Sequence, residues 1–453
     1  MPKAKKNTMD SSSNQSAQII SVPEIKSQIA PVESKLPMKT ESDAVSEQTE
    51  FDVIVVGGGP SGSSTAAFLS KAGKKVLLLD KQKFPRDKTC GDGISGRSVR
   101  MLTELGVYQD FKNVEHLDMY GVTFSSPNGT VAPISSPKKE NGSPPGFVCR
   151  REVFDNVLFQ NAKKLATRTI EGFVANDLVM EGSKVVGVKG LVNGKEQIFK
   201  AKVIVGADGA GGMSSRKLNA LQTDDDHLCA GIRCYYENVG GMIDQIELHF
   251  VKEALPGYFW IFPLPNGKAN VGIGMVVSDM KKKKINLQKV MFDIIENNPT
   301  FKDRFKNAKR TTEVKSWLLP FASKRVKMSG DGYVLVGDAA SLIDPFTGEG
   351  IGNALTSGRA ASAAIVEALN KNDVSASSLA KYETLLMADI EKEVKDNYKL
   401  QKMVKGEFLL NLIVGRAKKS KYVQGVISNA LINPDAHSTL SDPLFMFKAL
   451  FAP

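Results

Sequence analysis

Apolar residues follow two patterns along the chain, and each pattern predicts a different kind of strand. A short, continuous apolar run is typical of a parallel strand that is buried on both faces. Four such runs occur, at residues 53–56, 76–79, 203–205 and 333–336. From Leu228 to Val277 apolar and polar residues alternate instead, which predicts a separate antiparallel sheet. We expect its strands at residues 246–251, 257–264 and 268–277.

Apolar residues at helical spacing predict helices between and after these strands. The first three helices are expected at residues 61–72, 96–105 and 151–166. A further helix begins near Gly350, and helical patterns continue through Met403. Apolar clusters then follow beside several lysines, at residues 408–414, 423–432 and 444–451. The C-terminal region is therefore predicted to be helical.

The first apolar run leads into a glycine-rich turn, Gly57-x-Gly59-x-x-Gly62, then into a helix and a strand that ends at Asp80. Gly57 permits a tight turn, Gly59 lets the backbone approach a pyrophosphate, and Gly62 lets the helix pack on its strand. The helix N-terminus offers N–H groups to phosphates, and the Asp80 carboxylate is expected to accept a ribose hydroxyl. This stretch predicts a dinucleotide-binding βαβ unit.

A second glycine-rich segment, residues 337–352, follows the last buried strand. Asp338, at the end of that strand, is suited to accept a ribityl hydroxyl. The turn into the next helix would point N–H groups and the positive end of the helix dipole at a reduced, anionic flavin. An ordinary acidic helix cap is the alternative.

The predicted strand at 257–264 places Tyr258, Trp260 and Phe262 on one face, because alternate residues of a strand share a face. Three aromatic residues in a row form an apolar wall that suits a long hydrocarbon chain. The alternative is that they are simply the inward face of a sheet core.

The turn at 265–267 sets the partners of this aromatic row. A three-residue loop, with its glycine in the left-handed conformation, pairs Trp260 with Gly272 and Tyr258 with Gly274. The two glycines would then leave a slot under the aromatic rings, and valine at either position would block it. A two-residue loop would place the glycines on the other face.

The composition is typical of a globular protein and gives no sign of a nucleic-acid-binding or membrane-spanning protein. Of the 453 residues 42% are apolar, as in ordinary globular proteins. The 60 basic and 49 acidic residues are spread out, and no tract interleaves basic with aromatic residues, so nothing predicts nucleic-acid binding. No apolar run approaches the roughly 18 residues of a membrane span. The four cysteines lack zinc-ligand spacing, so we expect reduced thiols, a cytoplasmic location and no metal site.

Residues 1–49 are polar and lack apolar periodicity, so they are predicted to form a disordered tail. A transit peptide is the alternative, but this segment contains no arginine and several acidic residues. We therefore place the start of the fold after it.

Three motifs together resemble the FAD-dependent oxidoreductases of the para-hydroxybenzoate hydroxylase type. They are GGGPSG at 57–62, GADGAGGMSSR at 206–216 and GDAASLIDPFTGEGIGNA at 337–354. The resemblance implies bound FAD. The positions that would contact its adenosine and pyrophosphate groups are Ser61, Asp80, Arg151 and Ala175. Those at the ribityl chain and isoalloxazine ring are Asp338, Gly350 and Ile351, and Asp208 would be structural.

Within that superfamily the chain resembles the geranylgeranyl reductases. The resemblance rests on the tract YxWxFP at 258–263 with the later GxG at 272–274, and on KxCG at 88–91. It implies that the prenyl chain contacts Tyr258, Trp260, Phe262, Pro263, Gly272 and Gly274. Cys90, Gly91 and Gly93 would lie beside the flavin. Cys90 is also the candidate catalytic residue, and a merely small, buried cysteine is the alternative.

The predicted fold is α/β, with a FAD-binding Rossmann-like domain, a discontinuous antiparallel-sheet substrate domain and a helical C-terminal region. We assign residues 50–107, 151–218 and 329–370 to the FAD-binding domain. The substrate-binding domain would comprise residues 108–150 and 219–328, and the C-terminal region residues 371–453.

The implied activity is reduction of C=C bonds in geranylgeranyl chains on a lipid, a chlorophyll-type compound or a diphosphate. NAD(P)H or ferredoxin is expected to supply electrons, because the sequence has no second GxGxxG strand–helix unit. One rival is a flavin-dependent monooxygenase or halogenase, although a halogenase would be expected to carry WxWxIP. The other is a non-catalytic prenyl-binding carrier. The basic, apolar C-terminal region predicts peripheral membrane contact, with packing on the substrate domain as the alternative.

Overall fold

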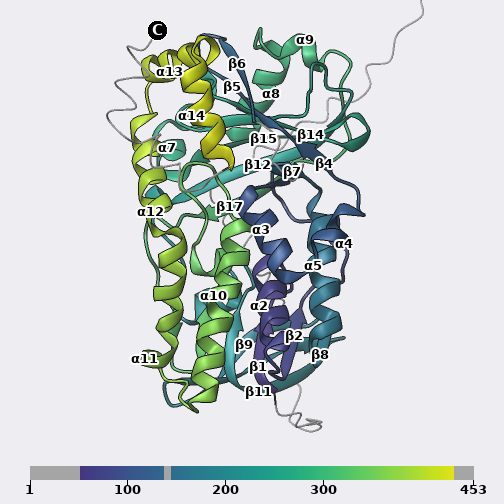
Figure 1. Ribbon diagram of the computed structural model, residues 1–453, viewed down its shortest axis with the longest axis vertical. Helices are drawn as coiled ribbons and strands as arrows, with labels where there is room; N and C mark the ends of the chain where they lie inside the picture. Colours follow the sequence, from purple (N-terminus) through teal and green to yellow (C-terminus); the bar gives the residue numbers. More distant parts are fainter. Residues whose placement is uncertain (1–50, 137–143, 433–453) are drawn as a thin grey trace, which may run out of the picture.

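The computed structural model describes residues 51–136 and 144–432, which form an elongated molecule in two tiers (Figure 1). The lower tier in that view contains a mostly parallel sheet flanked by helices, and the upper tier contains a mostly antiparallel sheet. The predicted tail at 1–49 and the apolar cluster at 444–451 lie outside the described residues.

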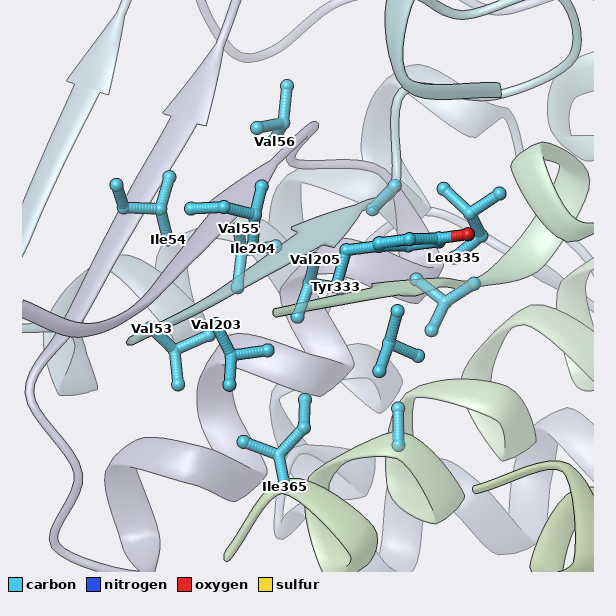
Figure 2. Close-up of a cluster of buried hydrophobic side chains, with 14 of the residues drawn as sticks. Val53, Ile54, Val55, Val56, Val203, Ile204, Val205, Tyr333, Leu335 and Ile365 are labelled. Atoms are coloured by element: carbon cyan, nitrogen blue, oxygen red, sulfur yellow. The ribbon is translucent and has the colours of Figure 1, made fainter. Parts of the chain in front are cut away.

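The continuous apolar runs form the first sheet. Its main strands are β1 (Phe51–Val56), β2 (Val76–Asp80), β8 (Arg168–Glu171), β11 (Lys195–Gly206), β18 (Ser329–Gly330) and β19 (Tyr333–Leu335). They lie in the order β18-β19-β11-β1-β2-β8, and every neighbouring pair except β18 and β19 runs parallel. β9 (Val174–Glu181) and β10 (Lys184–Val192) extend β11 as an antiparallel meander. Figure 2 shows buried valine and isoleucine side chains of β1 and β11 on both sides of these strands, with Val53 and Val203 on the side of Ile365.

Helices α2 (Pro60–Lys71), α5 (Arg151–Leu165) and α10 (Ile351–Asn370) flank this sheet. Small residues let α10 approach α2 closely, since a Cβ added at Gly358 would lie 2.1 Å from the Ser64 Oγ. The Ser362 hydroxyl on α10 also donates to the Thr65 carbonyl on α2 (3.2 Å). The two helices that begin at glycine-rich turns are therefore held side by side.

The alternating segment forms the second sheet. Its strands are β5 (Gly121–Ser125), β6 (Val131–Ser135), β12 (Leu228–Glu237), β13 (Ile246–His249), β14 (Tyr258–Leu264), β15 (Lys268–Val276), β16 (Lys309–Arg310) and β17 (Lys315–Pro320). The order is β16-β12-β15-β14-β13-β5-β6, with β17 also paired to β12. The face that bears Phe259, Ile261 and Ile273 packs on α8 (Leu287–Asn297) and α9 (Lys302–Phe305). The opposite face carries the aromatic row.

Shorter elements complete the described fold. A three-stranded sheet is formed by β3 (Gly93–Ile94), β4 (Leu117–Met119) and β7 (Gly146–Val148), near α3 (Gly96–Leu105) and α4 (Tyr108–Lys112). The later helices are α7 (Val277–Lys282), α11 (Ala376–Leu379), α12 (Lys381–Met403), α13 (Glu407–Lys419) and α14 (Lys421–Ile432). Figure 1 shows α12 running along one side of the molecule, and α13 and α14 pack on β5 and β6.

The predicted fold class is confirmed, and most elements lie within a residue or two of their expected bounds. One strand pairing differs from the expectation. β13 is antiparallel to β14 but parallel to β5, which arrives from far earlier in the chain. The sheet is therefore mixed rather than purely antiparallel. The residue boundaries of the two domains stay an interpretation of the sequence.

Candidate cofactor and substrate site

The three glycines of the first motif differ in the space around them. Gly57 has a φ of +110°, and a Cβ there would lie 2.3 Å from the Ala207 carbonyl oxygen. A Cβ at Gly62 would lie 1.7 Å from the Gly57 oxygen, so α2 sits tightly on β1. A Cβ added at Gly59 would meet only the Arg86 Nη2, at 3.4 Å. Gly59 is thus the position at which a phosphate has room to approach the backbone.

The Asp80 carboxylate holds the glycine-rich turn in place. Its Oδ2 accepts a hydrogen bond from the Gly58 amide (2.6 Å), and its Oδ1 accepts one from the Gln82 amide (2.7 Å). Asp80 lies at the end of β2, as predicted, with 8% of its surface exposed. Its contact with a ribose hydroxyl stays a prediction.

Arg151 is buried and paired inside the protein. Its guanidinium forms two hydrogen bonds with the Asp155 carboxylate, both 2.7 Å, and Arg86 donates to the same carboxylate at 2.6 Å. Burial alone would raise the pKa of Asp155, but the charges of Arg151 and Arg86 lower it, so Asp155 is ionised. Arg86 binds Asp155 through Nη1, and its Nη2 lies next to Gly59, so Arg86 is a better-placed cation for a pyrophosphate than the buried Arg151. Arg86 was not predicted from the sequence. The one feature that could have indicated it is its position as a basic residue in the loop after β2.

The remaining adenosine-side candidates occupy different places. Ser61 lies in the first turn of α2, where a Cβ at Gly337 would come within 2.6 Å of its Oγ. Ala175 lies at the start of β9, pairs with Gly190 and packs against the core of the first sheet. Asp208 accepts a hydrogen bond from the Ser214 amide (2.9 Å) at the start of α6 (Met213–Lys217). This contact is consistent with the structural role expected of Asp208.

The second glycine-rich segment forms the other half of the cradle. Asp338 lies just after β19, and its Oδ2 is 3.4 Å from the Lys88 Nζ. A Cβ at Gly350 would lie 3.5 Å from the Asp338 Oδ1, and Ile351 opens α10. Neither α10, capped by Gly350, nor α2, capped by Gly59, receives a hydrogen bond from a capping side chain. Two helix N-termini without side-chain caps, together with the room beside Gly59, fit an anionic dinucleotide such as FAD.

The aromatic row has the predicted register. Tyr258 pairs with Gly274 and Trp260 with Gly272, across a three-residue turn. Gly267 is left-handed as expected (φ 70°), and Asn266 before it is left-handed as well (φ 61°).

The predicted slot under the rings is wrong at Gly272. A Cβ at Gly272 would lie 2.2 Å from the Trp260 ring, so the indole itself occupies the space that the missing side chain leaves. At Gly274 the nearest neighbours lie at ordinary contact distance, the Cys229 sulfur at 3.5 Å and the Trp260 ring at 3.7 Å. Gly272 therefore seats the indole instead of a substrate chain.

The loop of residues 88–93 packs against this row. Cβ atoms at Gly91 and Gly93 would lie 3.1 and 3.2 Å from the Phe262 ring. Pro263 in the same strand is buried and pairs with Ala269. Cys90 is partly buried, and its carbonyl accepts a hydrogen bond from the Asn270 side chain (2.7 Å). The loop thus lies between the cofactor cradle and the aromatic row.

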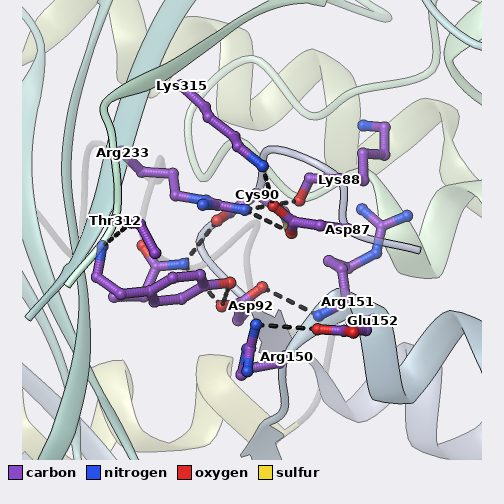
Figure 3. A network of polar contacts seen from close by, with 12 residues as sticks. Asp87, Lys88, Cys90, Asp92, Arg150, Arg151, Glu152, Arg233, Thr312 and Lys315 are labelled. Atoms are coloured by element: carbon purple, nitrogen blue, oxygen red, sulfur yellow. Dashed lines mark hydrogen bonds and ion pairs between the residues drawn. The ribbon is translucent and has the colours of Figure 1, made fainter. Parts of the chain in front are cut away.

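A polar network behind the loop was missed from the sequence (Figure 3). Arg233 is 1% exposed, donates to the Asp87 carboxylate at 2.7 Å and lies over the Tyr235 ring. Asp87 also binds Lys315 (2.7 Å). Asp92 is fully buried, and burial raises the pKa of its carboxyl against the opposing donors around it. A lone Arg or Asp in a strand or loop carries no pattern that would have indicated these contacts.

The other cysteines are expected to stay protonated at neutral pH. Burial raises the pKa of Cys229 and of Cys234 to about 12, and it raises the pKa of Cys149 as well. Among residues 51–136 and 144–432 no group of three or more His, Cys, Asp or Glu side chains is placed to hold a metal ion.

Comparison with known proteins extends these observations. The family model described as "FAD binding domain" matches residues 50–388. The digeranylgeranylglycerophospholipid reductase of Methanocella arvoryzae is 32% identical over 363 residues, 79% of this chain and 88% of that protein. The menaquinone reductase of Mycobacterium tuberculosis is 31% identical over 343 residues, 75% of this chain and 80% of that protein.

Solved structures agree with these relatives. A geranylgeranyl bacteriochlorophyll reductase-like protein from Thermoplasma acidophilum superposes with a TM-score of 0.75 at 27% identity, covering 87% of this chain and 99% of that one. A flavin-dependent brominase has a TM-score of 0.66 at 23% identity, covering 85% and 99%, and shares the fold. The chain therefore belongs to the FAD-binding oxidoreductases, in the reductase family that includes the digeranylgeranylglycerophospholipid reductases.

Proposed function

We propose that this protein uses FAD to saturate C=C bonds in the geranylgeranyl chains of a lipid, with a prenylated glycerophospholipid as the first candidate. The observation that carries the proposal is the position of the aromatic row. Tyr258, Trp260 and Phe262 share one face of β14, and the loop at 88–93 joins this face to the FAD cradle. The names of the relatives support the choice of substrate class.

The chemistry requires an apolar, well-ordered site. An isolated alkene has no carbonyl for the protein to polarise, so positioning must supply much of the catalysis. Bound FAD supplies the hydride equivalent. The aromatic row would hold the prenyl chain and exclude water. The Tyr258 hydroxyl donates to the Thr347 carbonyl (2.8 Å), which ties the row to the turn before α10.

Cys90 is the candidate proton donor, because it is partly buried in the loop between the row and the cradle. Comparing Cys90→Ser, which keeps an O–H group, with Cys90→Ala, which has no proton to donate, would separate proton delivery from packing. We expect both variants to keep FAD, and the alanine variant to lose the larger share of kcat.

Lipid analysis tests the proposed function. A host that makes geranylgeranyl lipids should, when it expresses this chain, accumulate species heavier by about two mass units for each reduced bond. The Asp338→Ala variant is the matched control, because it removes a carboxylate from the FAD cradle and leaves the aromatic row intact. Unchanged lipids in the presence of flavin-loaded protein would refute the proposal.

We infer that the electrons reach FAD from a separate donor, either NAD(P)H or ferredoxin. The chain presents one dinucleotide-binding motif, and residues 57–80 already account for it. Anaerobic bleaching of the flavin by NADH, by NADPH or by reduced ferredoxin would identify the donor.

A peripheral membrane contact is also proposed. No helix among the described residues is long and apolar enough to cross a bilayer. On α13 the side chains of Leu410, Val414 and Ala417 are buried, while Phe408 is 81% exposed. Lys418 and Lys419 lie exposed at the end of the same helix. The buried residues of α13 pack on β6. Its exposed Phe408 and lysines are suited to contact an anionic membrane surface.

A further inference from the structure

The loop at 88–93 holds a buried acid in an unusual backbone conformation. Asp92 is 0% exposed and has a φ of 69°, a region that favours glycine. Its Oδ2 accepts hydrogen bonds from the Tyr235 hydroxyl and the Asn270 side-chain amide, both 2.8 Å, and its Oδ1 accepts one from the Arg151 amide (3.3 Å). Left-handed strain in a non-glycine residue persists only where the surroundings hold it in place.

Asn270 joins this acid to the aromatic row. Its side-chain Nδ2 donates to both the Asp92 carboxylate and the Cys90 carbonyl, while its Oδ1 accepts a hydrogen bond from the Trp260 indole N–H at 2.9 Å. The Asn270 side chain is fully buried, and every one of these bonds requires the same orientation of its amide group. If the Asn270 amide were flipped, its NH₂ group would face the Trp260 indole N–H, donor against donor. Its oxygen would face the Asp92 carboxylate, acceptor against acceptor.

The Trp260 indole also packs against the backbone of the neighbouring strand. The Trp260 ring lies over Gly272, where any side chain would collide with it. The hydrogen bond from Nε1 then leaves the ring a single orientation in its plane. The orientation of Trp260 and the path of the Cys90 loop are consequently set by the same two buried side chains.

We propose that Asp92 and Asn270 are positioning residues, which orient the Trp260 indole toward the prenyl chain and keep it in register with the Cys90 loop. This proposal rests on the proposed function for the identity of the substrate. The orientation of Trp260 can be tested without a substrate. Neither residue needs to touch the substrate, since both act through Trp260 and the loop.

The conformation of Asp92 supplies a matched set of variants. Asp92→Gly removes the carboxylate and suits the left-handed backbone, so the substitution adds no backbone strain that would confuse the result. Asp92→Asn retains an oxygen that accepts from Tyr235 and Asn270. Asn270→Leu removes all three bonds of the amide while filling a similar volume, and it serves as the second variant if Asp92→Gly folds poorly.

The chain contains two tryptophans, so a Trp317→Phe background leaves Trp260 as the reporter. In FAD-loaded protein, Asp92→Gly and Asn270→Leu should shift the Trp260 emission and lower its anisotropy, and Asp92→Asn should restore both. With a geranylgeranyl lipid, the first two should raise KM about tenfold with kcat changed less than about threefold. Combining them should cost no more than Asn270→Leu alone, because they act on one chain of bonds.

Trp260 emission, anisotropy and KM that stay unchanged in both Asp92→Gly and Asn270→Leu would overturn the proposal. An equal rise in KM in Asp92→Gly and Asp92→Asn would also overturn it, because the oxygen retained in Asp92→Asn should restore the wild-type KM. If the wild-type protein reduces no prenyl lipid, the proposed function fails, and the emission measurement still decides whether Asp92 orients Trp260.

Discussion

Gly272 and Gly274 stand two residues apart in the same strand, yet their surroundings differ sharply. A Cβ at Gly272 would meet the Trp260 ring at 2.2 Å and the Ile232 carbonyl oxygen at 2.3 Å. At Gly274 nothing lies closer than 3.5 Å. We therefore expect Gly272→Ala to lower the free energy of unfolding by about 1–3 kcal/mol and to displace the indole, while Gly274→Ala changes it by less than about 0.5 kcal/mol.

Chemical denaturation of the two alanine variants, followed by their KM for a geranylgeranyl lipid, checks this difference. Equal stability in the two variants would contradict the seating of the indole on Gly272. The result also separates the present account from a substrate slot, in which both glycines would matter alike.

Gly59 and Gly62 allow a similar comparison at the cofactor cradle. Gly59→Ala has room in the protein and should fold normally, with weaker FAD retention, because its methyl group would occupy the space left for the pyrophosphate. Gly62→Ala meets the Gly57 oxygen at 1.7 Å and should destabilise the fold itself. Thermal unfolding without added flavin, together with FAD titration, distinguishes the two effects. Normal FAD affinity in Gly59→Ala would count against this position of the pyrophosphate.

The sequence indicated residues that stand in a motif and missed those that act through contacts. Gly57, Gly62 and Trp260 follow from spacing and alternation, so their roles or partners could be predicted. Asp92 and Asn270 could not, because their hydrogen bonds join a loop to a strand about 180 residues later in the chain. The slot failed for a related reason: pairing fixes which side chains are neighbours but not how an indole turns.

At the scale of elements, α13 offers a test of membrane contact. Replacing Phe408, 81% exposed, with serine removes apolar area without touching the packing of Leu410 and Val414 on the fold. We expect Phe408→Ser and a Lys418→Gln/Lys419→Gln pair each to weaken flotation with anionic liposomes at low salt. Circular dichroism should be unchanged in both. Wild-type protein that does not float at low salt would refute the contact.

Local signals predicted the elements better than their pairing. The strand–helix–strand order around the glycine-rich turn, and the three-residue turn between β14 and β15, are set by neighbouring residues and were confirmed. The parallel pairing of β5 with β13 joins segments about 120 residues apart and has no local signal. The order of strands in the second sheet is a property of the tertiary fold.

For the molecule as a whole, a buried histidine makes stability depend on pH. His249 is 0% exposed, with its ring nitrogens 2.9 Å from the Ser125 Oγ and the Glu247 Oε2. Burial lowers the pKa of His249 in spite of Glu247, so below its ordinary value of 6.5 the unfolded chain binds a proton that the folded chain does not. The free energy of unfolding should fall as pH drops through this range.

His249→Asn should remove this component. Between pH 6.5 and 5 the wild-type protein should lose up to about 1.4 kcal/mol per pH unit more than the variant. Parallel slopes in denaturant titrations at these pH values would contradict the assigned direction. The comparison with the variant excludes titrating groups that do not contact His249, and Glu247, which does, keeps its two hydrogen bonds from Arg304 in both proteins.

In the proposed reaction, bound FAD delivers its electrons to a prenyl C=C bond. Flavin-loaded protein would be reduced chemically without oxygen, freed of excess reductant and mixed with a geranylgeranyl glycerophospholipid. We expect the flavin absorbance to return as the lipid gains about two mass units, with one bond reduced per flavin. A flavin that stays reduced until oxygen is admitted, with the lipid then gaining an oxygen or a halogen or remaining unchanged, would contradict it.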